Sequence, residues 1–251
     1  RYDYNAQAAR GLDVISRINY ARGPGRVEEL RELALGTINR LIAQVCGAHD
    51  VRPEEISNAV VAGNPTMTHL VLGLKPEYIR IDPYTPTVRT LPYLAAREAG
   101  LGISPDSWVY FCPSVGSYVG GDITAGILCT GLVEPGAGGL SLFMDIGTNG
   151  EIVIGDGDFL VTCACSAGPA FEGGGIECGM RAAVGAIERV RIEPATGECS
   201  IGTIGDAQPI GSCGSGMFMP SRMDGILLSR PLRSESISSM DSFFLSGFSS
   251  I

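Results

Sequence analysis

The spacing of hydrophobic residues predicts helices in the first part of the chain. Residues 11–21 and 26–46 both repeat apolar side chains at helical intervals. In the second of these segments we expect the helix to bury a stripe formed by Leu30, Leu33, Ile38, Leu41, Ile42 and Val45.

Strands and capping signals follow. The short apolar run 58–62 fits a buried strand, and Asn64 with Pro65 predicts the N-cap and first residue of a helix over 65–73. Further along, the pattern indicates an irregular proline-rich segment, a strand and a helix, at 74–93, 108–112 and about 119–131.

The second part of the chain has the pattern of β-hairpins. Apolar runs at 140–146 and 151–154 flank an Asn-Gly pair, which predicts a tight turn. The remaining elements that we expect are a strand, a glycine-containing helix and a β pair, at 159–164, 172–186, 187–193 and 199–204. This mixture of helices and hairpins predicts an α/β fold, with a lobe over 1–138 and the start of a second lobe over 139–216.

Residues 217–251 differ in composition from the rest. They hold ten Ser and four of the seven Met, and no Ala, Val, Thr or Lys. Two interpretations follow: a disordered Ser-rich tail, or a tail that is not native because the reading frame was lost near Gly216. Under either interpretation we expect no function there.

Composition excludes several classes of function. The 251 residues are 45% hydrophobic and 18% charged, which excludes general disorder, and no apolar run is long enough to span a membrane. A net charge of −9 argues against general nucleic-acid binding. Eight scattered cysteines in a long chain fit a reducing, cytoplasmic protein. The Arg1 start suggests a trimmed or incomplete chain.

The run 144–155, MDIGTNGEIVIG, is the first candidate for chemistry. Asp145 ends an apolar strand and the turn-forming residues Gly147, Thr148, Asn149 and Gly150 follow. Backbone N–H groups in such a turn can cradle a phosphate, and a carboxylate at the strand end can hold Mg²⁺ or orient a water. A simple tight hairpin explains the same residues.

The run 163–182 is the second candidate. Its glycines, Gly173 and Gly174 among them, could open a helix whose N–H groups receive an anion, or could only allow close packing. Cysteines at 163, 165, 178 and 213 raise an iron–sulfur interpretation, although buried structural cysteines are common. His69 lies near a strand end, where a satisfied core histidine is the favoured interpretation.

Five segments together resemble the reductive activators of corrinoid-dependent methyltransferases. They are DVISRINYA (13–21), VVAGNPTMTHLVLGL (60–74), PSVGSYVGGDITAGIL (113–128), DIGTNGEIVIG (145–155) and CSAGPAFEGGGIECGMRAAVGAI (165–187). The resemblance implies a two-lobed ATPase fold of the actin, sugar-kinase and heat-shock class, incomplete in this chain. In that family the ATPase domain is joined to a [2Fe–2S] ferredoxin domain. Together they couple ATP hydrolysis to reduction of Co(II) corrinoid to Co(I).

The resemblance also implies roles for individual residues. Asp145 becomes the Mg²⁺ or water-orienting carboxylate and Glu151 points into the same cleft. Gly147, Thr148 and Asn149 hold the phosphates of ATP. By likeness to activators of dehydratases, Cys165 is a candidate ligand of a cluster shared by two subunits, which implies a homodimer.

The sequence therefore predicts part of an ATP-dependent reductive activator. Its expected partners are a corrinoid protein or corrinoid-dependent methyltransferase, which carries the corrinoid, and an electron donor. The ferredoxin cysteines and a first phosphate loop are expected before Arg1, so we expect the chain alone to be inactive. The alternatives are a small-molecule kinase of the same superfamily and a non-catalytic interaction module that retains the fold.

Overall fold

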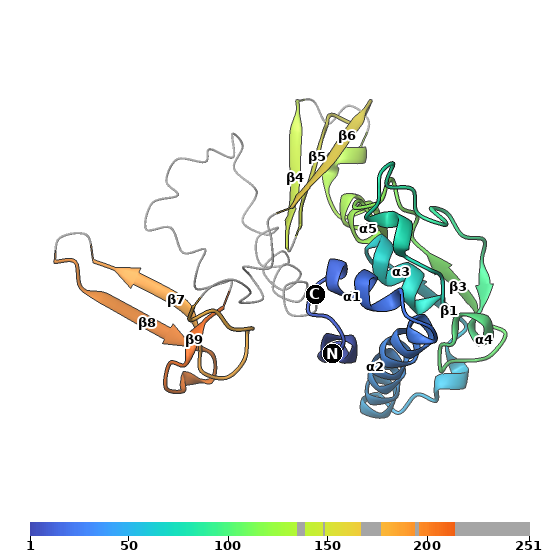
Figure 1. Cartoon of the computed structure of the whole chain (residues 1–251), viewed down its shortest axis with the longest axis horizontal. Coiled ribbons are helices and arrows are strands. Elements are labelled where there is room, and N and C mark those ends of the chain that lie inside the picture. Colours follow the sequence, from blue (N-terminus) through green and yellow to red (C-terminus); the bar gives the residue numbers. More distant parts are fainter. Residues whose placement is uncertain (135–138, 148, 167–176, 194–195, 214–251) are drawn as a thin grey trace. The chain divides into compact units, whose positions relative to one another are not determined.

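The computed structural model describes residues 1–134, 139–147, 149–166, 177–193 and 196–213. The chain divides into two compact units, Arg1–Cys165 and Ser166–Ile251, both drawn in Figure 1. Among the described residues, no helix is long and apolar enough to cross a membrane. Our predicted division at 138/139 stays a prediction.

A three-stranded sheet with the order β1-β3-β2 organises the first unit. The strands are β1 (Asn58–Val61), β2 (Leu94–Ala95) and β3 (Trp108–Phe111), with β1 parallel and β2 antiparallel to β3. The α-helices of this unit are α1 (Val14–Ala21), α2 (Arg26–Ala48), α3 (Pro65–Val71), α4 (Ala96–Ala99) and α5 (Gly121–Leu128). Short 3-10 turns lie at Ala6–Ala9, Pro53–Glu55, Glu77–Ile79 and Gly131–Val133.

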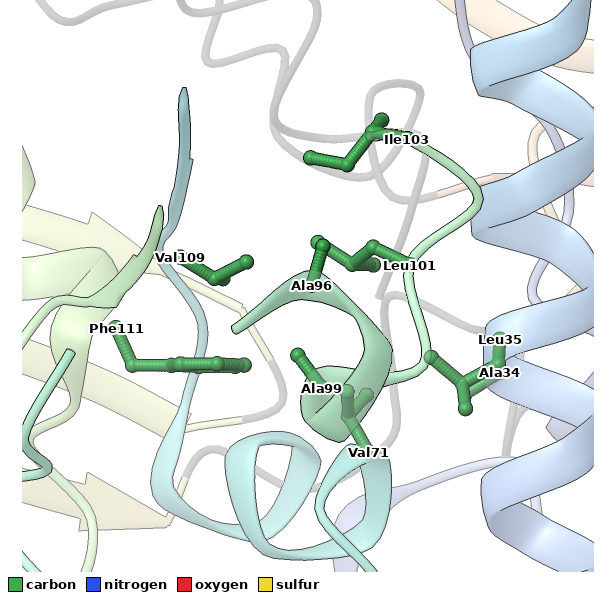
Figure 2. Close-up of a cluster of buried hydrophobic side chains, with 9 residues drawn as sticks. All are labelled: Ala34, Leu35, Val71, Ala96, Ala99, Leu101, Ile103, Val109 and Phe111. Carbon is green, nitrogen blue, oxygen red and sulfur yellow. The ribbon is translucent and has the colours of Figure 1, made fainter. Parts of the chain in front are cut away.

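The main core lies between one face of this sheet and helices α2, α3 and α4. Figure 2 shows the side chains of Val109 and Phe111 directed from β3 toward these helices. The buried cluster consists of Ala34, Leu35, Val71, Ala96, Ala99, Leu101, Ile103, Val109 and Phe111. Two of its members come from α2 and two from the single turn of α4, so small alanines let these helices approach the sheet closely.

The predicted helices of this unit and the predicted cap are confirmed, but two burial predictions were wrong. Helix α2 buries Leu30, Ala34, Leu35, Thr37 and Cys46, whereas Val45 of the predicted stripe is exposed. A prediction based only on large apolar side chains assigns the wrong face of this helix as buried, because alanines form the close contacts. Strand β1 is an edge strand rather than a buried one, and Val60 is 71% exposed.

A second sheet, β4-β5-β6, completes the first unit. Its strands are β4 (Ser141–Ile146), β5 (Asn149–Gly155) and β6 (Leu160–Ser166). It packs against the segment around α5 through Val119, Ile123, Ile127, Leu132 and Val153, with Phe143 and Ala164 beside them. Helix α5 is shorter than the predicted 119–131.

The prediction of a tight turn at Asn149–Gly150 was wrong, because both residues belong to a strand. Asn149 and Gly150 are the first residues of β5, and Gly150 pairs with Ile146. A Cβ on Gly150 would lie 3.1 Å from the sulfur of Cys165, tighter than most contacts of real Cβ atoms. This glycine therefore serves close approach between strands and not a turn conformation.

The described part of the second unit is a small sheet with the order β8-β7-β9. Strands β7 (Ala186–Ile192) and β8 (Cys199–Thr203) are antiparallel, as predicted, and β9 (Gly211–Ser212) runs parallel to β7. A 3-10 turn follows β8 at Ile204–Asp206.

The helix predicted over 172–186 is wrong for its described part, because turns and a bridge occupy 177–185. There the N–H of Met180 donates to the carbonyl oxygen of Ser212, and the N–H of Ser212 donates to the carbonyl oxygen of Cys178. These backbone groups therefore pair with a strand and not along a helix. Residues 172–176 and the tail 217–251 lie outside the described residues.

Candidate functional site

The candidate site begins where α5 starts, beside the carboxyl ends of β1 and β3. A Cβ on Gly121 would lie 2.5 Å from the carbonyl oxygen of Cys112, and one on Gly120 would lie 2.6 Å from the Cα of Asn64. Only glycine fits such distances without displacement of backbone atoms. The two glycines therefore let the helix begin against the strand ends, with Asp122 in its first turn.

The β4–β5 hairpin contributes two further carboxylates. Asp145 and Glu151 are direct partners in the antiparallel register, so their side chains project from the same face of the sheet. Beyond this pair the strands close, and the N–H of Gly147 donates to the carbonyl oxygen of Asn149 at 2.8 Å. The hairpin thus places two acids side by side next to a glycine turn.

The three carboxylates influence one another. Burial raises the pKa of Glu151 from 4.5 to about 7, and the charges of Asp145 and Asp122 contribute to this rise. Burial likewise raises the pKa of Asp122 to about 6, although its Oδ1 accepts a hydrogen bond from the N–H of Ile123 at 3.0 Å. Burial also raises the pKa of Asp145. Partly dehydrated like charges at one place favour a bound cation or a bound proton.

The donor set fits Mg²⁺ better than a closed metal cage. Carboxylate oxygens are ligands that Mg²⁺ prefers, and proteins commonly hold it through one or two of them, with waters and phosphates completing the octahedron. The described residues contain no group of three or more His, Cys, Asp or Glu side chains arranged to hold a metal alone. Asp145, aided by Glu151, would hold the ion in company with a phosphate ligand.

The described residues place no further cluster ligands around Cys165. It lies on β6, where its sulfur contacts the carbonyl oxygen of Gly150 at 3.4 Å. No described side chains join it in a metal-binding group of three. The described residues therefore do not assemble a cluster site around Cys165, and a cluster shared by two subunits stays a prediction. Thr148, Gly173 and Gly174 of our predicted site lie outside the described residues.

His69 is a core histidine, as favoured from the sequence. It is 1% exposed, its Nδ1 donates to the carbonyl oxygen of Pro65 at 2.6 Å, and its Nε2 accepts from the N–H of Val88 at 3.3 Å. Both ring nitrogens are occupied by backbone groups. Burial lowers its pKa, so the neutral ring is favoured.

Asp122 is the residue of this site that sequence reasoning missed. Its helix was predicted, but no residue of that helix was assigned to the site. The available signal was an acidic residue directly after the Gly120–Gly121 pair, at the beginning of a helix. Such a position points a carboxylate back toward the strand ends on which the helix rests.

The family models identify the class of this fold, which is that of an actin-like ATPase. Residues 139–221 match the model described as the C-terminal domain of RACo, the ASKHA domain. Residues 1–134 match the model described as the RACo middle region, which is more than half of the chain. The chain belongs to the RACo family, which confirms the predicted resemblance and the fold class.

Individual relatives agree with this assignment. The chain is 39% identical over 214 residues to the corrinoid activation enzyme RamQ of Eubacterium limosum, covering 85% of this chain and 35% of RamQ. It is 28% identical over 195 residues to the [Co(II) methylated amine-specific corrinoid protein] reductase of Methanosarcina barkeri, covering 73% and 34%.

A solved structure is also similar. The structure titled "Reductive activator for corrinoid,iron-sulfur protein" matches with a TM-score of 0.72 and 55% identity, over 85% of this chain and 34% of that one. The chain thus spans about a third of the length of each of these three relatives.

Proposed function

We propose that this chain supplies part of the ATPase region of a reductive activator, in which ATP hydrolysis drives reduction of a Co(II) corrinoid to Co(I) on a partner protein. The observation that carries the proposal is the coupled set of three carboxylates formed by Asp122, Asp145 and Glu151 beside the Gly147 turn. The names of the relatives, all activators or reductases of corrinoid proteins, support it.

The chain's own residues have distinct tasks in this proposal. Bound Mg²⁺ supplies charge neutralisation for the phosphates of ATP. Asp145 would orient the ion or its water, and Gly147, where the hairpin ends without a side chain, would let phosphate oxygens approach the backbone. Glu151, whose pKa is about 7, can hold or release a proton near neutral pH beside the reacting phosphate.

Asp122 connects this chemistry to the rest of the fold. It lies in the first turn of α5, and α5 packs on the sheet that carries Asp145 and Glu151. Neutralisation of the three acids by a cation therefore removes repulsion between a helix and a sheet. We propose that this change favours one arrangement of α5 relative to the hairpin, and that it is how nucleotide state is passed on.

The reduction itself needs one electron per cobalt. In the proposal the donor is a low-potential redox centre of the [2Fe–2S] class held by a separate domain or protein, because the described cysteines do not assemble a ligand set. The partner is a corrinoid protein or corrinoid-dependent methyltransferase. We place this chemistry in the cytoplasm, and a homodimer is compatible with the shared-cluster prediction.

Titration calorimetry of the chain with Mg-ATP tests the nucleotide site. We expect binding that Asp145→Asn and Glu151→Gln each weaken about tenfold or more, while the exposed Glu54→Gln serves as the matched control and binds as the original chain does. Equal affinity in all four proteins would place the nucleotide elsewhere and refute the site.

The activator function has a separate test. A complete activator carrying these residues, mixed with its corrinoid protein, a reductant and Mg-ATP, should produce the absorption spectrum of Co(I). In this mixture Asp145→Asn should leave Co(II). Persistent Co(II) with the unmodified activator, or Co(I) without ATP, would overturn the proposed coupling.

A further inference from the structure

Helix α5 meets the β4–β5 hairpin through a glycine and an aromatic ring. A Cβ placed on Gly126 would lie 3.0 Å from Cζ of Phe143 and 3.6 Å from its Cε2, which is tighter than most contacts of real Cβ atoms. The tip of the ring therefore points at the glycine. Phe143 also packs against the cluster in which Ile123 and Ile127 of the helix are buried. The close approach of helix and hairpin thus depends on Gly126 having no side chain.

Phe143 lies on the face of the hairpin that carries the two acids. Residues alternate across a strand, so Phe143 and Asp145 share one face of β4. Burial agrees with this alternation, because the neighbouring side chains of Leu142 and Met144 are exposed. In the register Glu151 of β5 lies opposite Asp145 and projects from the same face. The ring and both acids of the hairpin are therefore on the face that contacts α5.

Asp122 and Gly126 form the matching pair on the helix. They are four residues apart, so they lie on one face of α5 and about 6 Å apart along its axis. Phe143 and Asp145 are two residues apart on β4, which separates them by about 7 Å. Because the two spacings nearly match, a helix seated with Gly126 on Phe143 brings Asp122 toward Asp145. The raised pKa of Asp122, to which the charge of Asp145 contributes, agrees with this placement.

The start of α5 is also fixed to the first sheet. The Thr124 hydroxyl donates to the carbonyl oxygen of Pro113 at 2.9 Å, directly after the end of β3. The N–H of Gly121 donates to the carbonyl oxygen of Gly63 at 2.9 Å, beyond the end of β1. These bonds hold the helix at the strand ends. A side chain added at Gly126 is therefore accommodated by displacement of the hairpin, which carries the two acids with it.

We propose that the contact between Gly126 and Phe143 is the positioning element of the carboxylate site: it sets the separation between the acid of α5 and the two acids of the hairpin, and through it the affinity for Mg-ATP. This inference rests on the nucleotide site proposed above. Both residues act through the acids and not on the ligand. A bound cation needs ligands held to within about 0.5 Å of the productive geometry, so a small displacement of the hairpin matters.

Substitutions of graded size at Gly126 test the proposal. We expect Gly126→Ala to weaken the binding of Mg-ATP about threefold and Gly126→Leu about tenfold or more, because the larger side chain displaces the hairpin further. Gly47→Leu is the matched control, because Gly47 is an exposed helix residue whose Cβ would meet no described atom within 4 Å. Titration calorimetry measures the affinities, and circular dichroism verifies that each variant is folded. Unchanged affinity in folded Gly126→Leu overturns the inference.

A compensating substitution separates positioning from a general loss of stability. Phe143→Ala removes the ring that the added leucine side chain would meet. The double variant Gly126→Leu, Phe143→Ala should therefore recover affinity to within about threefold of the original chain. A general weakening of the fold predicts the opposite, because Phe143→Ala by itself removes buried contacts. Absence of recovery in the folded double variant overturns the inference. If Gly126→Leu alone folds poorly, Gly126→Ala and the double variant still supply the comparison.

A readout without nucleotide keeps the inference distinguishable from the proposed function. A double-mutant cycle of Asp122→Asn and Asp145→Asn, measured by urea unfolding at about pH 8.5, reports the repulsion between the two carboxylates. We expect Gly126→Leu to reduce this coupling by about half or more and the added Phe143→Ala to restore it, because the repulsion falls with distance.

The outcomes of this cycle and of the calorimetry can be read separately. Coupling that Gly126→Leu leaves unchanged overturns the positioning role, even where Mg-ATP binds the original chain. Coupling that responds as expected in a chain that does not bind Mg-ATP supports the positioning role and refutes the nucleotide site.

Discussion

Replacement of Glu151 by Gln should change how the stability of the chain depends on pH. Glu151 is half-buried beside Asp145 and Asp122, and its pKa rises from 4.5 to about 7 in the folded chain. The folded state therefore holds a proton on Glu151 that the unfolded state has already released. Such a group stabilises the fold least at high pH, because stability is lost as the pH rises from the unfolded pKa to the folded one.

The size of the effect follows from the two pKa values. With 4.5 in the unfolded and about 7 in the folded chain, Glu151 alone removes about 2.5 kcal/mol of unfolding free energy between about pH 5 and about pH 8. This figure is an upper limit, since solvent screens a half-buried group. Glutamine has the same shape and no charge, so Glu151→Gln should lose this part of the pH dependence and gain stability relative to the original chain at the alkaline end.

The assay is urea unfolding at a series of pH values, followed by circular dichroism and by the fluorescence of the single Trp108. Trp108 belongs to the same compact unit as Glu151. The quantity to compare is the difference in unfolding free energy between Glu151→Gln and the original chain at each pH. Taking the difference cancels most of the titration of Asp122, whose pKa rises to about 6 and whose effect has the same sign.

The exposed Glu54→Gln is the matched control and should track the original chain at every pH. If Glu151→Gln also tracks it, the carboxylate is not buried among like charges, and the electrostatic basis of the candidate site is refuted. A stability difference that grows toward acid pH would have the wrong sign and would refute it equally.

Three other substitutions, with Gly47→Ala as a control, test the parts of the fold that position the site. Gly121→Ala should cost about 1–3 kcal/mol of unfolding free energy, because its Cβ would lie 2.5 Å from the carbonyl oxygen of Cys112. Gly47→Ala in α2, where a Cβ would meet nothing within 4 Å, should instead gain about 0.5–1 kcal/mol. Urea unfolding measures both variants. The pKa of His69 is lowered from 6.5, chiefly by burial, so the stability that its neutral ring contributes is present above that value and is lost as the pH falls below it. His69→Gln should therefore flatten the stability profile as the pH falls below 6.5, and an unchanged slope there would contradict the buried neutral ring. Asn64→Ala removes the cap whose Oδ1 accepts an N–H of α3 at 2.8 Å and should cost about 1 kcal/mol, measured by thermal unfolding.

Local signals predicted the elements that depend on local physics. The cap formed by Asn64 and Pro65 is confirmed at the start of α3, because a capping side chain acts on N–H groups only two or three residues away. The buried face of α2 was harder. Ala34 and Ala99 are both buried because other elements pack on them closely. The sequence alone does not show whether an alanine is buried in such a contact or exposed to solvent.

The same difference applies to the helix that was predicted over 172–186. In its described part, the backbone of 178–180 forms hydrogen bonds with Ser212, a residue far along the chain, in place of helical hydrogen bonds. Rules based on hydrophobic periodicity use only the residues of the segment itself. They cannot include a distant strand that competes for the N–H groups of that segment. Asp122 was missed for a related reason: its closeness to Asp145 depends on the packing of α5 against a sheet that follows it in sequence.

The pairing of Asp145 with Glu151 shows how much the strand register matters. A two-residue turn at Asn149–Gly150 would have placed Asp145 opposite Ile154, and alternation along β5 would then have sent Glu151 to the other face. The observed register instead places Gly150 opposite Ile146 and the two acids opposite each other. The turn rule alone would have separated the carboxylates, and only the family resemblance placed them in one cleft. The chemistry of the site therefore depends on Gly150 being small enough to sit in a strand against Cys165, which is a packing requirement and not a turn preference.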